Sequence, residues 1–172
     1  MAEAYFISET TLKNNSYING NVDNALLMPT LIMVQDIYLQ PILGTPLFED
    51  FKTKIDADPT LAAYPTYLAL SRDYIKKVLI NYMCMYSIDA LRYRLMNKGV
   101  MVKNGETSSP ADSSELKNLK DEFRNIAEKY SENLTKYLAQ NTDTFPLYLE
   151  TTLTGDNAKK TNYSTGIYLD EL

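Results

Sequence analysis

The chain has 172 residues, of which 45% are hydrophobic and 23% are charged, and its formal net charge is -5. A chain of this length can bury about 70% of its unfolded surface in one core. Because the chain also has only 6 glycines and 7 prolines, its composition excludes the collagen-like, low-complexity and wholly disordered classes. It contains no histidine, and Cys84 is its single cysteine. An internal disulfide and the imidazole-based catalytic triads are therefore excluded as well.

We predict that the protein is not an enzyme and binds no cofactor. General acid-base catalysis most often relies on histidine, and every Asp and Glu fits a helix cap or a solvated helix face. A zinc site with thiolate or imidazole ligands would need ligands from several chains, because each chain has one cysteine and no histidine. The N-terminus lacks a basic region, and we expect no apolar run near the roughly 20 residues that span a bilayer. These features predict an intracellular protein without a membrane partner.

The first 22 residues are polar with short apolar stretches, and they predict an extended N-terminal arm. Asp23 can cap the helical core that follows. We expect a turn of helix and then a helix from about Pro29 to Leu39, followed by a break at Gly44 and a short helix from Pro46 to about Ile55. The predicted core domain covers residues 23–142.

Apolar residues at spacings of three and four predict one long amphipathic helix over residues 66–96. A helix of this length spans about 46 Å, which is longer than a compact chain of this size needs. Long helices depend on packing more than on propensity. Part of this helix is therefore expected to meet another subunit.

A basic segment coincides with this helix. Residues 72–103 carry seven bases against two acids, whereas residues 1–50 and 104–172 each have a net charge of -5. The basic residues could contact DNA or an acidic partner, although a solvated helix face with ordinary ion pairs also explains them. The candidates are Arg72, Lys76, Lys77, Arg92, Arg94 and Lys98.

After the long helix, residues 97–110 predict a projecting hairpin with its turn at Asn104-Gly105. Asp112 and Glu115 form a capping-box pattern that begins a second long helix, which should end near Asn141 and pack antiparallel to the first. The fold class is therefore an all-α helical bundle with a long central helix, a short β-hairpin or loop, and extended terminal arms.

Residues 143–172 predict a C-terminal arm that is too rich in large apolar groups to stay solvated. We expect this arm, and the hairpin, to lie on the chain's own core or to bind a neighbouring subunit. The candidate interface residues are Val100, Val102, Phe145, Pro146, Leu147, Tyr148, Tyr163, Ile167 and Tyr168.

Two residue patterns permit a ligand but favour packing. The 14 tyrosines could stack on nucleic-acid bases, yet several occupy apolar helix positions where a phenol buries its ring and keeps its hydroxyl wet. Met83, Cys84 and Met85 are soft metal donors, but adjacent residues on a helix point about 100° apart. Packing accounts for both patterns.

Three segments resemble the head-to-tail connector (adaptor or ring) proteins of tailed bacteriophages, particularly those of the crAss-like group. They are the run from Gln35 to Phe48, the tyrosine-rich helix that ends in Asn97-Lys98-Gly99-Val100, and the run from Phe145 to Tyr148. The similarity covers roughly residues 20–150. Its motifs are structural rather than catalytic.

This resemblance implies a virion protein at the head-tail junction that is made in the host bacterial cytoplasm. Such proteins form a homo-oligomeric ring, commonly of about twelve copies with heterologous contacts, beneath the portal. The ring continues the DNA channel and contacts the portal protein and further tail or ring proteins. Because this chain is acidic, contact with packaged DNA is expected to be transient and non-specific.

Two other classes stay open. A nucleic-acid-binding helical regulator would use the basic central helix and would bind duplex DNA in a strongly salt-dependent way. A hydrolase would need a pocket that brings two carboxylates together.

Overall fold

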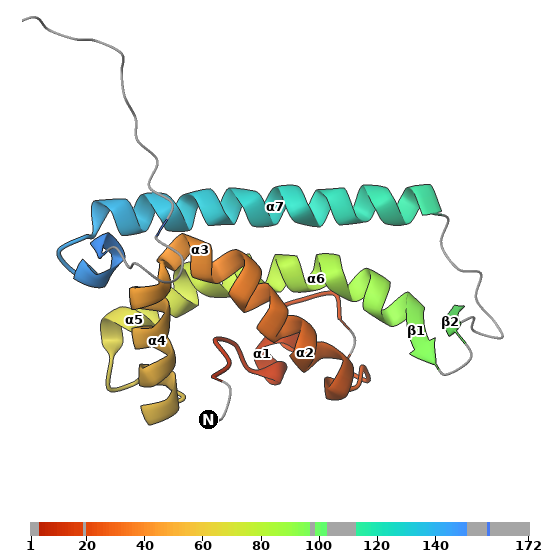
Figure 1. The fold of residues 1–172 in the computed structure, drawn as a ribbon, viewed down its shortest axis with the longest axis horizontal. Coiled ribbons are helices and arrows are strands. Elements are labelled where there is room, and N and C mark those ends of the chain that lie inside the picture. Colours follow the sequence, from red (N-terminus) through yellow and green to blue (C-terminus); the bar gives the residue numbers. More distant parts are fainter. Residues whose placement is uncertain (1–3, 19, 97–98, 103–112, 151–157, 159–172) are drawn as a thin grey trace, which may run out of the picture.

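The computed structural model describes residues 4–18, 20–96, 99–102, 113–150 and 158. Within these ranges the chain is mostly helical, which confirms the predicted helical class. Two long helical rods lie side by side and antiparallel along the molecule (Figure 1). One rod comprises α5 (Pro65–Leu70), the π-helical segment η2 (Ser71–Ile75) and α6 (Lys76–Arg92), and the other is α7 (Ser113–Gln140).

The two rods pack through the apolar stripes that the sequence predicts. On α7, the side chains of Phe123, Ala127, Leu134 and Leu138 are buried, at the spacing of an amphipathic helix. They face the buried stripe of the first rod. That stripe comprises Ile75, Val78, Leu79, Tyr82 and Met83.

A third helical run lies against α6 and is formed by α2 (Asn24–Val34), η1 (Gln35–Leu39) and α3 (Gln40–Leu43). The predicted cap is confirmed, because the Asp23 side chain accepts a hydrogen bond from the Ala25 N–H. The predicted turn of helix and the helix that was expected from Pro29 form one continuous helix, which passes through Pro29.

The same run corrects our expectation about apolar segments. By length and composition, Asn24–Leu43 is a helix long and apolar enough to cross a membrane, with a mean hydropathy of 1.4. A core helix of a folded domain meets the same criteria. Here Leu27, Leu31, Val34 and Leu39 are buried in the core.

Gly44 separates this run from α4 (Thr45–Ala57), as the sequence predicts. Its φ of +75° lies in the region that L side chains rarely adopt. The apolar side of α4 is buried and comprises Leu47, Phe48, Phe51 and Ile55.

The N-terminal segment is not an extended arm in residues 4–18, contrary to our expectation. It contains α1 (Glu9–Asn14) and buries Ala4, Phe6, Ile7, Leu12 and Ile18 in the core. The buried Gln35 amide fixes this segment, because its Oε1 accepts from the Phe6 N–H at 3.0 Å and its Nε2 donates to the Ala4 carbonyl at 3.2 Å. The ring of Phe6 stacks on that of Phe48, with centroids 5.1 Å apart.

The long rod ends at Arg92, four residues before the expected position. Strands β1 (Tyr93–Met96) and β2 (Gly99–Val102) follow and pair antiparallel, with Tyr93 opposite Val102. Tyr93 and Leu95 fit an alternating strand pattern as well as a helical one, so periodicity alone did not decide this boundary. The turn predicted at Asn104-Gly105 lies outside the described residues.

The C-terminal arm was predicted to begin at residue 143, but the chain stays folded on its own body through residue 149. The 3-10 helix η3 (Pro146–Leu149) places Tyr148 in the core, and Phe145 is also buried. The Phe145 ring lies 5.6 Å from that of Tyr67 and 6.4 Å from that of Tyr137. Three aromatic rings therefore hold this end of α7.

Candidate functional site

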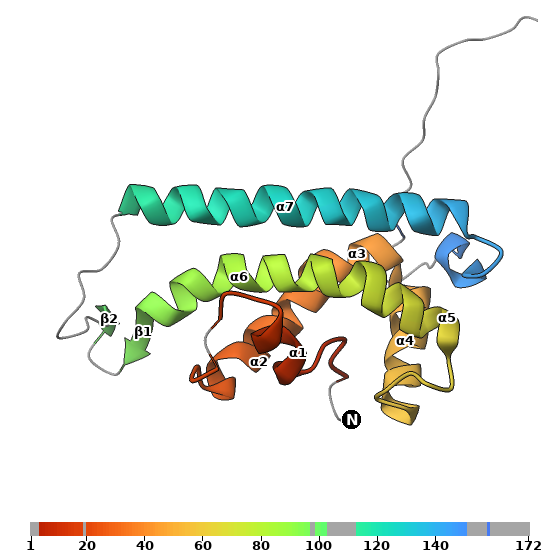
Figure 2. The same cartoon turned by 180° about the vertical axis from the view of Figure 1, so that it is seen from behind.

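Figure 2 shows α1 in front of α2. An apolar groove, lined in part by the loop that follows α1, runs beside α7. It has a volume of about 730 Å³. Three segments line it: the loop between α1 and α2, helix α6, and the first half of α7. The lining residues are Tyr17, Ile18, Val22, Asn81, Cys84, Ser87, Ile88, Leu91, Leu119, Glu122, Phe123, Ile126 and Tyr130.

The rim of this groove exposes large apolar side chains. Tyr17 is 90% exposed, Leu119 40% and Ile126 37%. The Tyr17 ring lies over the groove with its centroid 5.8 Å from that of Phe123. Exposed apolar side chains that gather around one groove are typical of an interaction site.

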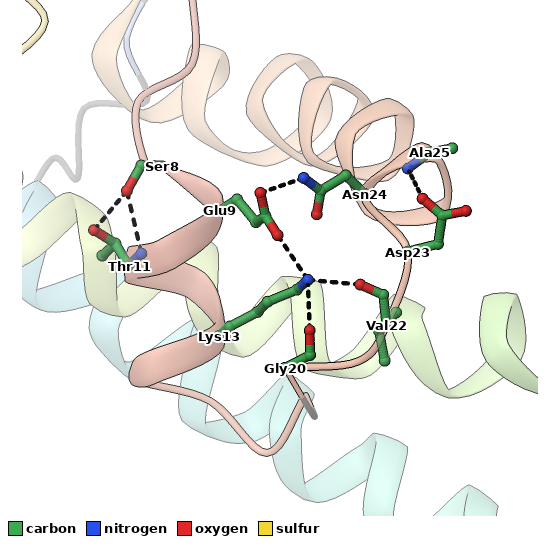
Figure 3. Close-up of polar contacts among 9 residues, drawn as sticks. All are labelled: Ser8, Glu9, Thr11, Lys13, Gly20, Val22, Asp23, Asn24 and Ala25. Carbon is green, nitrogen blue, oxygen red and sulfur yellow. Dashed lines mark hydrogen bonds and ion pairs between the residues drawn. The ribbon is translucent and has the colours of Figure 1, made fainter.

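The loop that carries Tyr17 is held by one ammonium group (Figure 3). Lys13 Nζ donates to the Gly20 carbonyl at 3.0 Å and to the Val22 carbonyl at 2.6 Å. It also forms an ion pair with Glu9 at 2.7 Å, and Asn24 donates to the other oxygen of that carboxylate. The Lys13 and Asn24 contacts hold the pKa of Glu9 below its ordinary range. These contacts fix the loop on the rim of the groove.

Two polar side chains lie at the floor of the groove. Burial raises the pKa of the Cys84 thiol, which favours its neutral form. The Ser87 hydroxyl is buried and has no hydrogen-bond partner among the described residues. Within the described part of the chain, neither group is paired with an acid or base that would make it a nucleophile.

The groove continues at one end into a basic hollow of about 440 Å³. Asn81 and Tyr130 line both spaces, so the two form a single trough. The other residues of the hollow are Thr11, Asn15, Arg72, Lys76, Lys77 and Ile80. We refer to the groove and the hollow together as the α7 trough.

The basic side chains of the hollow differ in whether they form an ion pair. Arg72 forms two hydrogen bonds to the carboxylate of Asp73, at 2.8 and 2.9 Å, and this ion pair lowers the pKa of Asp73. Lys77 Nζ lies 5.8 Å from the centroid of the Tyr130 ring. No ion pair engages Lys76 or Lys77 within the described ranges. These two ammonium groups give the hollow its positive charge.

A second groove, of about 570 Å³, lies on the opposite side of α7. It is more polar than the first and carries Glu128, Glu132 and Lys136 from α7. The rings of Tyr38 and Tyr82 stack in its wall with centroids 3.8 Å apart, and the Tyr38 hydroxyl lies 2.8 Å from that of Tyr86. Burial, together with this hydrogen bond, raises the pKa of Tyr38 to about 12.

The structure brings only part of the predicted interface to the surface. Phe145 and Tyr148 are core residues, because their rings complete the packing at the end of α7, so their prediction as partner contacts is wrong. Pro146 is exposed, and Leu147 is half-buried. Val100 and Val102 belong to β2. The predicted contacts Tyr163, Ile167 and Tyr168 lie outside the described residues.

The basic candidates are also divided. Arg72, Lys76 and Lys77 gather at the hollow, as the sequence suggests. Arg92 ends α6 and Arg94 belongs to β1, whereas Lys98 lies outside the described residues. The groove-lining residues Tyr17, Leu119 and Ile126 were not predicted as site residues. Leu119 and Ile126 belong to the apolar stripe of α7, where spacing does not separate a buried residue from a rim residue.

No group of three or more acidic or cysteine side chains within the described ranges could hold a metal ion. The trough therefore offers apolar surface and positive charge rather than a metal centre.

Comparison with known proteins identifies a family over most of the chain. No curated protein and no solved structure matches the sequence. A family model described as a family of unknown function, DUF6712, matches residues 39–158. This match includes α6, α7 and η3, and hence two of the three walls of the apolar groove. The chain therefore belongs to the DUF6712 family.

Proposed function

We propose that this protein is a structural adaptor of a tailed bacteriophage, a head-to-tail connector that assembles into a ring beneath the portal. The ring, of about twelve copies, continues the DNA channel toward the tail at the head-tail junction of the virion. The protein is made in the host bacterial cytoplasm, and its partners are other copies, the portal protein and further tail or ring proteins. It acts by packing surfaces and not by catalysis.

The observation that carries this proposal is the apolar groove beside α7. Its rim leaves Tyr17, Leu119 and Ile126 exposed, although Phe123, Ala127, Leu134 and Leu138 of α7 are buried in the core. Covering such side chains with a partner is favourable by about 25 cal/mol per Å² of apolar surface. An assembly subunit needs a surface of this kind.

Two further features support an assembly role. The long rods give the subunit an elongated body that can contact neighbours on two sides (Figures 1 and 2). The β1-β2 hairpin lies beyond the end of α6, where it can act as a projecting contact within a helical bundle. The segments quoted for the connector resemblance, from Gln35 to Phe48 and from Phe145 to Tyr148, form structural parts of the fold.

The proposal is tested by native mass spectrometry and negative-stain electron microscopy of the full chain, alone and mixed with a portal protein from the same genome. We expect a closed ring, either by itself or on the portal. The variant Leu119→Asp, Ile126→Asp should reduce ring formation, whereas Ile37→Asp, at a more exposed position outside the groove, should not. A chain that stays a single copy with the portal present would contradict the proposal.

A nucleic-acid-binding protein is the second candidate, favoured by the positions of Lys76 and Lys77 at the hollow. Such a protein would bind duplex DNA with an affinity that falls steeply as salt increases. The variant Lys76→Glu, Lys77→Glu would then lose binding at low salt. A ring subunit would show only weak binding, independent of DNA sequence.

A further inference from the structure

We propose that residues 163–171 of a neighbouring copy bind along the α7 trough. This inference rests on the proposed function, because it names the partner that covers the exposed groove. It makes each copy both the donor of a C-terminal segment and the acceptor of the segment from the next copy. The segment itself lies outside the described residues.

Apolar and acidic residues follow one another along the segment in the same order as apolar and basic residues along the trough. Its apolar residues Tyr163, Ile167, Tyr168 and Leu169 come first, and Asp170 and Glu171 follow. The trough begins with the apolar groove and ends in the basic hollow. Seated in one direction, the segment places its apolar side chains in the groove and its two carboxylates beside Lys76 and Lys77.

The lengths also agree. Leu91 and Lys76 mark the two ends of the trough on the first rod, and a helix covers about 22 Å between them at its usual rise. An extended stretch from Tyr163 to Glu171 covers about 26 Å. One segment can thus reach from the apolar end to the basic end.

Ala158, the last described residue before the segment, lies on the side of α7 away from the trough. Ala158 packs against Gly44, whose Cβ position would lie 2.9 Å from the Ala158 nitrogen. Gly44 follows α3, which contributes Pro41 and Ile42 to the second groove. The α7 residues Ile126 and Thr135, one in each groove, are about two and a half turns apart and hence on opposite faces.

A donor site and an acceptor site on opposite faces produce a heterologous contact, the kind that closes into a ring when its rotation permits. The second groove is a poorer acceptor, because it presents one cation, Lys136, beside Glu128 and Glu132, whereas the hollow presents Lys76 and Lys77. These observations select the trough, and a neighbouring copy, over binding within one chain.

The first test measures docking directly. The acceptor is the full chain with its own segment disabled by Ile167→Asp and Tyr168→Asp, and the probe is a fluorescent peptide of residues 159–172. We expect saturable binding by fluorescence anisotropy that weakens about 10-fold or more when the acceptor also carries Ile126→Asp, or Lys76→Glu with Lys77→Glu. The matched control Ile37→Asp, 53% exposed in the second groove, should leave binding unchanged.

Charge reversal makes this test specific. A peptide with Asp170→Lys and Glu171→Lys should bind the Lys76→Glu, Lys77→Glu acceptor better than the unaltered peptide does. Absence of peptide binding, or binding that is lost with Ile37→Asp and kept with Ile126→Asp, would overturn the inference. Circular dichroism confirms that each acceptor keeps its helices, which is expected because the altered groove positions are exposed.

The second test distinguishes binding between copies from binding within one chain. Chains with a defective groove (Ile126→Asp) and chains with a defective segment (Ile167→Asp, Tyr168→Asp) are analysed by native mass spectrometry, separately and mixed. Binding between copies predicts mixed pairs that form only in the mixture, whereas their absence overturns the inference. Rings that still form when the segment is defective would overturn the inference but leave the proposed function standing. Peptide docking without any ring would instead support the docking site and contradict the proposed function.

Discussion

The ammonium nitrogen of Lys13 donates a hydrogen bond of 2.6 Å to the backbone carbonyl of Val22, and this contact joins α1 to the loop in front of α2. Lys13 is the only basic residue among the first 50. Its side chain is 12% exposed, whereas that of Glu9 is 36% exposed. Lys13 and the buried side chain of Ile18 together fix the loop on the rim of the apolar groove.

Replacing Lys13 with Met should therefore release the loop while keeping the length of the side chain. Hydrogen bonds to charged groups contribute about 1.5–3 kcal/mol each, and the loss of this cluster should lower the free energy of unfolding by about 2 kcal/mol or more. Urea unfolding measures the change, and hydrogen exchange should become faster in residues 15–22. The control Lys52→Met, at a more exposed ion pair with Glu49, should change stability by less than about 1 kcal/mol.

The same cluster predicts a dependence on pH. The pKa of Glu9 is lowered in the folded chain, first by its hydrogen bond to Lys13 and then by that to Asn24. A lowered pKa stabilises the fold above the ordinary range of a glutamate, and this contribution is lost as pH falls through the folded value. The stability difference between the wild-type chain and Glu9→Gln should thus be larger at pH 7 than at pH 3. In a Lys13→Met background the difference should depend less on pH, and an unchanged dependence would contradict the prediction.

Gly44 provides a third prediction. Substitution with Ala places a Cβ at 2.9 Å from the Ala158 nitrogen, in a backbone conformation with φ of +75°. Strain of this type costs about 1–3 kcal/mol, so Gly44→Ala should lower the melting temperature and loosen the contact with Ala158. Gly20→Ala is the matched control, because no atom lies within 4 Å of its Cβ position, and it should be nearly neutral. Equal effects of the two substitutions would contradict this account.

Phe145 provides a fourth prediction, which distinguishes a core residue from an interface residue. Removal of a buried phenylalanine ring costs about 3–5 kcal/mol, so Phe145→Ala should destabilise the isolated subunit strongly. Leu149→Ala, four residues later and 49% exposed, should change the free energy of unfolding by no more than about 0.5 kcal/mol. Chemical denaturation at two protein concentrations measures both variants. If Phe145→Ala lowers the free energy of unfolding only at the protein concentration at which subunits associate, the Phe145 ring belongs to an interface and not to the core.

The sequence predicted the helices whose apolar stripes are regular. The stripe of α7 from Phe123 to Leu138 is confirmed, and so are the reversal at Gly44 and the cap at Asp23. These features depend on local chemistry: a period of 3.6 residues, a positive φ, and a side-chain acceptor at a helix start.

Features that depend on distant partners could not be predicted in this way. The N-terminal segment looked like an arm because its apolar stretches are short, yet the amide of Gln35, 29 residues from Phe6, pairs with its backbone. Phe145 looked available because its partners Tyr67 and Tyr137 come from other helices. The groove was missed for the same reason, since its walls come from three separate segments.

Two turns of the long helices contain one residue more than an α-helical turn. The Gln40 N–H reaches back five residues to the Gln35 carbonyl, and the Lys76 N–H does the same to Ser71. Deletion of a single residue within such a turn would restore ordinary α-helical bonding without rotating the residues that follow. Chain length can therefore change by one at these two places during evolution, and homologous sequences shorter by one residue should have their alignment gaps there.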